Sequence, residues 1–170
     1  MSFLALLTAA FLVIANSAAA QDQMFPPGDF GFRYEARRCT TTEFDTGAHT
    51  YTRVAANVSE PRISIPLSLG PNQMVVVYRE IVRIGFFDYQ PDFRRVVPRL
   101  GGDTTSRTPS TAYRMEVRSR GMTHTVSYND GETPRSEEAE RLLGLFDLID
   151  GFLNEHPDVK RLAPIRDPCD

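Results

Sequence analysis

The sequence predicts an α+β fold, an antiparallel sheet of about five strands with two helices packed on one face. Three observations predict it: runs in which apolar and polar residues alternate, one hairpin whose register and polarity agree, and two stretches with apolar residues at helical spacing. The chain has 170 residues, of which 41% are apolar and 24% charged. This composition is typical of one globular domain and excludes a repeat array or a disordered tail.

The first twenty residues have the pattern of a secretory signal peptide. Residues 1–20 contain no charged side chain, an apolar run of about 13 residues begins at Phe3, and three consecutive alanines end at Ala20. The run is shorter than the roughly 20 residues that cross a bilayer, which makes a retained anchor the weaker alternative. We therefore expect cleavage after Ala20, a single domain over residues 21–170 with no membrane span, and a periplasmic or secreted protein.

If the protein is exported, its two cysteines, Cys39 and Cys169, are expected to form a structural disulfide bond. An isolated even pair in an oxidising compartment predicts one disulfide bond. The bond would close a loop of about 130 residues, which the chain-entropy model values at about 4–5 kcal/mol. Two redox-active thiols are the alternative, but these need a pair close in sequence such as Cys-x-x-Cys, which the chain lacks.

Alternation predicts three strands in the first half of the mature chain. Residues 30–37 alternate apolar and polar side chains, and a second β-prone run spans residues 48–55. We expect these two runs to form a hairpin with Cys39 in its first arm or just past it. Residues 63–67 alternate again, but Pro66 has no N–H to donate, so this segment is predicted to be an edge or entry strand.

A helix is predicted over residues 71–84. Pro71 suits the first helical turn, apolar residues recur at helical spacing as far as Ile84, and Gly85 suits the helix end. The β-branched run Val75–Val77 makes a strand the alternative. Residues 90–111 are rich in proline and glycine and predict a connection of about 20 residues, a length that is usually functional or disordered.

The clearest local prediction is a hairpin around Arg120-Gly121. A two-residue turn there places Ser119 opposite Met122 and, at the far end, Tyr113 opposite Tyr128. This register brings the apolar side chains to one face and the polar ones to the other. Register and polarity therefore agree.

A second helix should follow the hairpin and lie across the sheet. We expect Thr133 to be its N-cap, Pro134 its first residue and a broad apolar stripe to extend to Pro157. Glu137, Glu138 and Glu140 suit the positive end of the helix dipole, and they lack the loop pattern of a calcium site. The tail after this helix should bring Cys169 back to Cys39.

The residue types of common catalytic and metal sites occur here without the required spacing. The three histidines, His49, His124 and His156, are isolated, and no phosphate-binding loop or nucleophile elbow is found. We expect His124 to be partly buried and hydrogen-bonded, and His156 to terminate a helix. No metal and no cofactor are expected. The net charge of −3 argues against nucleic acid or an anionic membrane as a partner.

The long connection carries the strongest candidate binding residues. Aromatic residues and arginine anchor many protein interfaces, since each adds contact area at modest entropic cost. The candidates are Tyr89, Phe93, Arg94, Arg95 and Arg99. In the alternative interpretation Phe93 tucks under the loop and the arginines are merely hydrated.

The order of elements resembles that of emfourin-type domains. The matching features are Gly85–Tyr89 at a helix end, a variable loop, strands at Tyr113–Val117 and His124–Gly131, and Pro134 before a leucine-rich helix. The resemblance covers roughly residues 71–153. It implies a small bacterial α+β protein, and some members of the family inhibit thermolysin-like metallopeptidases.

The chain also departs from the emfourin pattern in its first third. Gly28–Phe32 stands where the family usually has a Ser-Gly-Gly-Phe-like segment, and Cys39 and the Pro66 segment are additions. We therefore transfer no inhibitory residue from the family.

These observations favour an exported, non-enzymatic protein-binding module. A peptidase inhibitor is its most specific form, with an exported metallopeptidase as the partner. One alternative is a periplasmic hydrolase that uses acidic side chains such as Asp45, Asp88 and Asp92. Another is a structural envelope protein.

Overall fold

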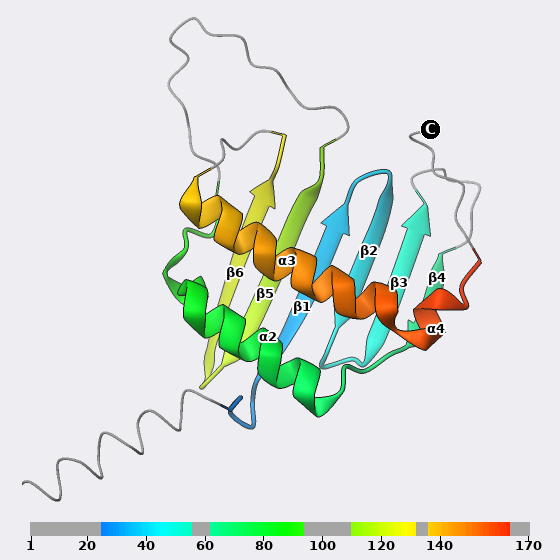
Figure 1. Cartoon of the computed structure of the whole chain (residues 1–170), viewed down its shortest axis with the longest axis horizontal. Coiled ribbons are helices and arrows are strands. Elements are labelled where there is room, and N and C mark those ends of the chain that lie inside the picture. Colours follow the sequence, from blue (N-terminus) through cyan, green and yellow to red (C-terminus); the bar gives the residue numbers. More distant parts are fainter. Residues whose placement is uncertain (1–24, 56–61, 94–109, 132–135, 164–170) are drawn as a thin grey trace, which may run out of the picture.

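Both long helices lie across one face of a six-stranded antiparallel sheet, and the other face is open (Figure 1). The computed structural model describes residues 25–55, 62–93, 110–131 and 136–163. The strand order is β4-β3-β2-β1-β5-β6. The strands are β1 Gly31–Arg37, β2 Thr40–Asp45, β3 Thr50–Ala55, β4 Ile63–Pro66, β5 Ala112–Ser119 and β6 Met122–Asn129, and the helices are α2 Pro71–Ile84, η1 Phe86–Asp88, α3 Glu137–Glu155 and α4 Pro157–Lys160. The α+β class is confirmed, with six strands instead of about five.

The additional strand is β2, and it changes the first hairpin. Tyr34 of β1 lies opposite Phe44 of β2, and Phe44 in turn lies opposite Tyr51 of β3. The predicted hairpin between residues 30–37 and 48–55 is therefore wrong, because β2 separates the two strands. Phe44 is the one buried residue of β2, so alternation gave little signal there, although β-branched threonines favour a strand.

The two faces of the sheet differ in chemistry because side chains alternate along each strand. The face toward the helices carries the core, which includes Phe32, Tyr34, Phe44, Met115, Val117 and Val126. The open face carries charged residues and hydroxyls. Across the central pair of strands, Arg33 lies opposite Glu116 and Glu35 lies opposite Arg114.

The hairpin of β5 and β6 is confirmed in every predicted pair. Ser119 lies opposite Met122, and Tyr113 lies opposite Tyr128. Arg120 and Gly121 have φ angles of 53° and 72°, as a two-residue turn of the mirror-image type requires. The Asp29 carboxylate accepts hydrogen bonds from both of their backbone N–H groups, at 2.9 and 2.6 Å, and so holds the chain before β1 to this turn.

The helix α2 is confirmed over the predicted residues. It ends at Gly85, whose φ of 68° lies in the left-handed region and whose N–H caps the last turn. The β-branched residues Val75–Val77 therefore do not prevent the helix, because the apolar stripe to which Val77 belongs packs against the sheet.

The start of α3 differs from the prediction. Ser136 is the N-cap, and its Oγ accepts a hydrogen bond of 3.1 Å from the N–H of Ala139. Thr133 is therefore not the N-cap, and residues 132–135, with Pro134, lie outside the described residues. The two hydroxyl residues are three positions apart, and the apolar stripe that begins at Ala139 suits a start at Ser136.

The predictions for the two ends of the chain concern residues that lie largely outside the described part. Cys39 is buried, at 5% exposure, and no described cysteine is a free thiol. Cys169 and residues 1–20 are not described, so the disulfide pairing and the signal peptide stay predictions. Of the helices described, none has the length and apolarity to span a membrane.

Candidate functional site

Two of the five candidate binding residues, Tyr89 and Phe93, pack against the core. Tyr89 is 9% exposed, and its hydroxyl donates a hydrogen bond of 3.2 Å to the backbone oxygen of Glu138 in α3. The ring centroid of Phe93 lies 5.4 Å from that of Tyr89 and 6.0 Å from that of Tyr128. These rings hold the start of the long connection in place.

The three arginines of the candidate set, Arg94, Arg95 and Arg99, lie outside the described residues. Their part in binding stays a prediction. What the structure describes is the chain on either side of them. We call the undescribed stretch the 94–109 connection.

Both ends of the 94–109 connection are held to the end of β6. Before it, a short strap, Pro91–Phe93, pairs with Ser127: the Ser127 N–H donates to Pro91 O at 2.8 Å, and the Phe93 N–H donates to Ser127 O at 2.9 Å. After it, the Thr111 N–H donates to Asp130 Oδ1 at 2.6 Å, and the Asp130 N–H donates to Thr111 O at 3.1 Å. The connection therefore leaves and rejoins the fold at two points that are three residues apart on the chain.

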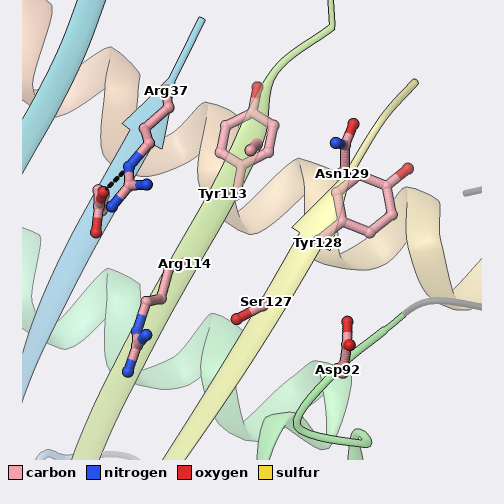
Figure 2. A pocket seen from close by; sticks show the side chains of 9 residues that line it. Arg37, Asp92, Tyr113, Arg114, Ser127, Tyr128 and Asn129 are labelled. Atoms are coloured by element: carbon pink, nitrogen blue, oxygen red, sulfur yellow. Dashed lines mark hydrogen bonds and ion pairs between the residues drawn. The ribbon is translucent and has the colours of Figure 1, made fainter. Parts of the chain in front are cut away.

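Beside these anchor points the open face is hollowed. We call this cavity of about 200 Å³ the β6 hollow (Figure 2). It lies over β1, β5 and β6. Its lining residues are Glu35, Arg37, Asp92, Ala112, Tyr113, Arg114, Ser127, Tyr128 and Asn129.

The β6 hollow is polar and is lined by both acidic and basic side chains. Arg37 pairs with Glu35, as the dashed line in Figure 2 shows. Arg114 makes no ion pair with any described residue, so its guanidinium can take a carboxylate from a partner. The hydroxyl of Ser127 and the amide of Asn129 add further hydrogen-bonding groups. Among the residues that the structure describes, carboxylates, a serine hydroxyl and two tyrosines line the hollow, and all of these groups can form hydrogen bonds with a bound molecule.

Two further hollows lie on the open face, of about 330 and 250 Å³. Both are lined by Arg33 and Asp45. Asp45 caps the turn between β2 and β3, because its Oδ1 accepts hydrogen bonds of 2.8 and 3.0 Å from the N–H groups of Gly47 and Ala48. Its carboxylate therefore has a structural role in the turn.

The carboxylates named for the hydrolase alternative do not come together. Asp45 lies at the β2–β3 turn, Asp88 in η1 and Asp92 beside β6. Among the residues that the structure describes, no cluster of three His, Cys, Asp or Glu side chains could hold a metal ion. The paired-carboxylate geometry that this alternative requires is not formed by these three residues.

The three histidines have structural contacts. His124 Nε2 lies 2.8 Å from the backbone oxygen of Tyr89, and its ring packs edge-on against Phe86, which confirms a partly buried, hydrogen-bonded histidine. His49 Nδ1 lies 3.0 Å from the hydroxyl of Ser68. His156 ends α3, as predicted, and its Nδ1 accepts the Asp158 N–H at 3.3 Å to begin α4.

One carboxyl group in a perturbed environment was missed by the sequence analysis. Asp150 of α3 faces the sheet, and burial raises its pKa to about 6, with a further rise from Asp147. The nearby Tyr34 hydroxyl lowers that pKa in part, although its geometry falls short of a standard hydrogen bond. Asp150 lines none of the three hollows described above, so it belongs to the packing of α3. Its position next to Ile149 in the apolar stripe was the available signal.

Comparison with known proteins does not assign the chain to a family. No protein-family model matches the chain, and no curated protein matches it. The emfourin-like pattern therefore remains a resemblance carried by the residues alone. Function has to be inferred from the surfaces described above.

Proposed function

We propose that the chain is an exported, non-enzymatic protein-binding module, with a peptidase inhibitor as its most specific form. The proposed partner is another protein, an exported metallopeptidase in the inhibitor form. The proposed location is periplasmic or secreted. The proposed binding surface is the 94–109 connection together with the β6 hollow at its base.

The double anchorage of the 94–109 connection is the observation that carries this proposal. The strap and the Thr111–Asp130 contacts fix both ends of the connection on the rigid end of β6. A connection with fixed ends has lost part of its conformational freedom before it meets a partner, which lowers the entropic cost of binding. The neighbouring hollow supplies the guanidinium of Arg114, which has no ion pair among the described residues, for an acidic side chain of that partner.

The exported state belongs to the same proposal. In an oxidising compartment a bond between Cys39 and Cys169 would tie the end of the chain to the start of β2. Mass spectrometry of the protein recovered from the periplasm of an expression host should give a chain that begins at Gln21. A non-reducing peptide map should contain one peptide pair joined through the two cysteines. An uncleaved chain, or two free thiols, would remove this part of the proposal.

The inhibitor form is tested directly with a thermolysin-type peptidase. The purified protein should inhibit peptide hydrolysis, and the combined change of Arg94, Arg95 and Arg99 to alanine should raise the inhibition constant tenfold or more, about 1.4 kcal/mol. The matched control changes three exposed arginines elsewhere, Arg62, Arg83 and Arg161, and should leave the constant within about twofold.

The same two triple variants test the broader proposal. If the wild-type protein fails to inhibit at micromolar concentration, the inhibitor form is wrong. Quantitative capture of one envelope protein from the source bacterium by the wild type and the control, but not by the loop variant, would still support a binding module. Equal capture by both variants would show that the 94–109 connection is not the binding surface.

A further inference from the structure

The two central strands of the sheet share one sequence pattern. β1 reads Gly-Phe-Arg-Tyr-Glu-Ala-Arg and β5 begins Ala-Tyr-Arg-Met-Glu-Val-Arg, so an aromatic residue, an arginine, a glutamate and a second arginine recur at the same positions. The two strands are antiparallel neighbours, and Tyr34 lies opposite Met115 at the midpoint of the shared pattern. A two-fold axis through that midpoint, perpendicular to the sheet, therefore places the pattern of one strand on that of the other.

The elements around these two strands follow the same axis. β2 flanks β1 and β6 flanks β5, and each pair is antiparallel. The helices α2 and α3 run in opposite directions over the sheet (Figure 1). The register places Phe44 of β2 on Val126 of β6, and both side chains are fully buried in the core. The centre of the fold therefore repeats one unit of paired strands and a helix about this axis.

Two of the three hollows on the open face are equivalent under this axis. One is the β6 hollow, and the other is the hollow of about 330 Å³, which we call the β2 hollow. Apart from Asp92, every lining residue of the β6 hollow has its counterpart in the lining of the β2 hollow. The charged counterparts are Arg37, Arg114 and Glu35 in the β6 hollow, and Arg118, Arg33 and Glu116 in the β2 hollow.

One guanidinium group in each hollow has no ion pair. In the β6 hollow Arg37 pairs with the glutamate of its own strand, and in the β2 hollow Arg33 Nη2 lies 3.8 Å from Glu43 Oε2. The second arginine of each hollow is Arg114 or Arg118. Neither side chain makes an ion pair or a hydrogen bond with any residue that the structure describes. Each hollow therefore offers one arginine to an acidic group from outside.

These two arginines and one glutamate form a row along β5. Arg114, Glu116 and Arg118 alternate with buried Met115 and Val117, so the three charged side chains share the open face. Glu116 has no ion pair among the described residues either. A strand rises about 3.3 Å per residue, which places the two arginines about 13 Å apart. Residues i and i+4 of any other extended chain are separated by the same distance and point to the same side.

We propose that the open face binds an extended segment of a partner protein with an acidic–basic–acidic pattern at alternate positions. Its acidic side chains at i and i+4 enter the two hollows and bind the guanidinium groups of Arg114 and Arg118. Its lysine or arginine at i+2 meets Glu116, which would repel an acidic residue at that position. The row therefore selects a charge pattern and not negative charge alone. This inference rests on the proposed binding role of the β6 hollow, and it adds the β2 hollow and the chemistry of the segment.

Two peptides of identical composition test the pattern. The probe is Gly-Glu-Thr-Lys-Thr-Glu-Gly with both ends blocked, and the control is Gly-Glu-Thr-Glu-Thr-Lys-Gly. Titration of the isotope-labelled protein, followed by its backbone amide shifts, should give a dissociation constant of about 1 mM or less for the probe. The control should bind about fivefold more weakly, because it matches fewer of the three charges. A probe that binds no more tightly than the control would overturn the proposal.

Single substitutions test whether both hollows take part. Arg114→Gln and Arg118→Gln should each weaken binding of the probe about threefold, whereas Arg161→Gln, at an exposed arginine after α4, should leave it unchanged. Glu116→Gln should weaken the probe and strengthen a peptide with glutamate at all three positions. A loss at only one of the two arginines would overturn the paired sites. An unchanged preference in Glu116→Gln would overturn the selection of the pattern.

The triple alanine variant of Arg94, Arg95 and Arg99 separates this inference from the proposed function. The variant retains both hollows and should bind the probe as the wild type does. If that variant and the wild type inhibit no peptidase but still prefer the probe to the control, the inference is supported and the inhibitor form is wrong. If inhibition is present and the preference is absent, this inference alone is overturned.

Discussion

Replacing Asp150 by asparagine should make the protein more stable at neutral pH and leave it unchanged in acid. The carboxyl lies between α3 and the sheet, and its burial disfavours the charged form. Asparagine has nearly the same size, carries no charge, and keeps a group that can face the Tyr34 hydroxyl. The substitution therefore removes the charge and little else.

The size and sign of the effect follow from the pKa. Folding raises the pKa of Asp150 from 3.8 to about 6, so the folded protein holds this proton more tightly than the unfolded chain. Below about pH 4 the carboxyl is neutral in both states and costs nothing. As the pH rises through about 6 the folded state bears an increasing penalty, which then stays constant at about 3 kcal/mol, since each pH unit corresponds to 1.36 kcal/mol. Asp150→Asn should recover up to that amount at pH 7.

Urea unfolding at several values between about pH 4 and pH 8 measures this difference. The free energies of unfolding of the wild type and Asp150→Asn should nearly coincide at about pH 4, separate between about pH 4 and 6, and then differ by a constant amount up to pH 8. The control is Glu140→Gln, an exposed carboxyl in the first turn of the same helix that is not among the groups that shift the pKa of Asp150, and it should change the free energy by less than about 1 kcal/mol. A constant offset between the two curves over the whole range, or a variant that is less stable at pH 7, would refute the reasoning.

Three further predictions concern the ends of elements. Asp29→Ala should speed amide hydrogen exchange at the β5–β6 turn, and unchanged exchange would contradict this. In the wild type, hydrogen bonds from the turn lower the pKa of the Asp29 carboxyl. These bonds are lost as the pH falls through that pKa, so the protection of the turn should decrease in acid. Gly85→Ala should cost about 1 kcal/mol in chemical denaturation, since its φ of 68° disfavours any side chain, whereas no loss would mean that the cap tolerates one. Ser136→Ala should cost about 1 kcal/mol while Thr133→Ala costs little, and the reverse order would restore Thr133 as the cap.

The elements that the sequence predicted well are those in which local and long-range signals coincide. For the β5–β6 hairpin, the turn at Arg120-Gly121 and the alternation on both sides independently require one register, and the structure has that register. The helix α2 begins at Pro71 and ends at Gly85, and its apolar stripe outweighs the β-branched run within it. Agreement between several weak signals therefore predicted these elements.

The strand β2 and the burial of Asp150 could not be predicted for one shared physical reason. Each depends on what packs against it, and not on its own neighbours in the chain. Phe44 is the single buried residue of β2, and the strand exists because β1 and β3 bind it on both sides. Asp150 becomes buried because strands from distant parts of the chain lie beneath α3.

The β6 hollow was outside the reach of sequence analysis for a similar reason. Arg37 and Arg114 line it together only because β1 and β5 are neighbours in the sheet, although they are far apart in the sequence. Tyr89 and Phe93 were chosen as candidates because they are aromatic. An aromatic side chain can pack against a partner or against the protein's own core, and the sequence does not distinguish the two cases.

The charge pattern across β1 and β5 has a consequence for how the chain folds. This pairing joins the four-stranded half of the sheet to the β5–β6 hairpin. If the two strands slipped by two residues, the apolar side chains would still meet on the helix side, but Arg33 would face Arg118 and Glu35 would face Glu116. Repulsion between like charges disfavours such misaligned pairings. The charged side chains on the open face therefore select one register between the two halves of the sheet, whereas apolar packing alone would allow several registers.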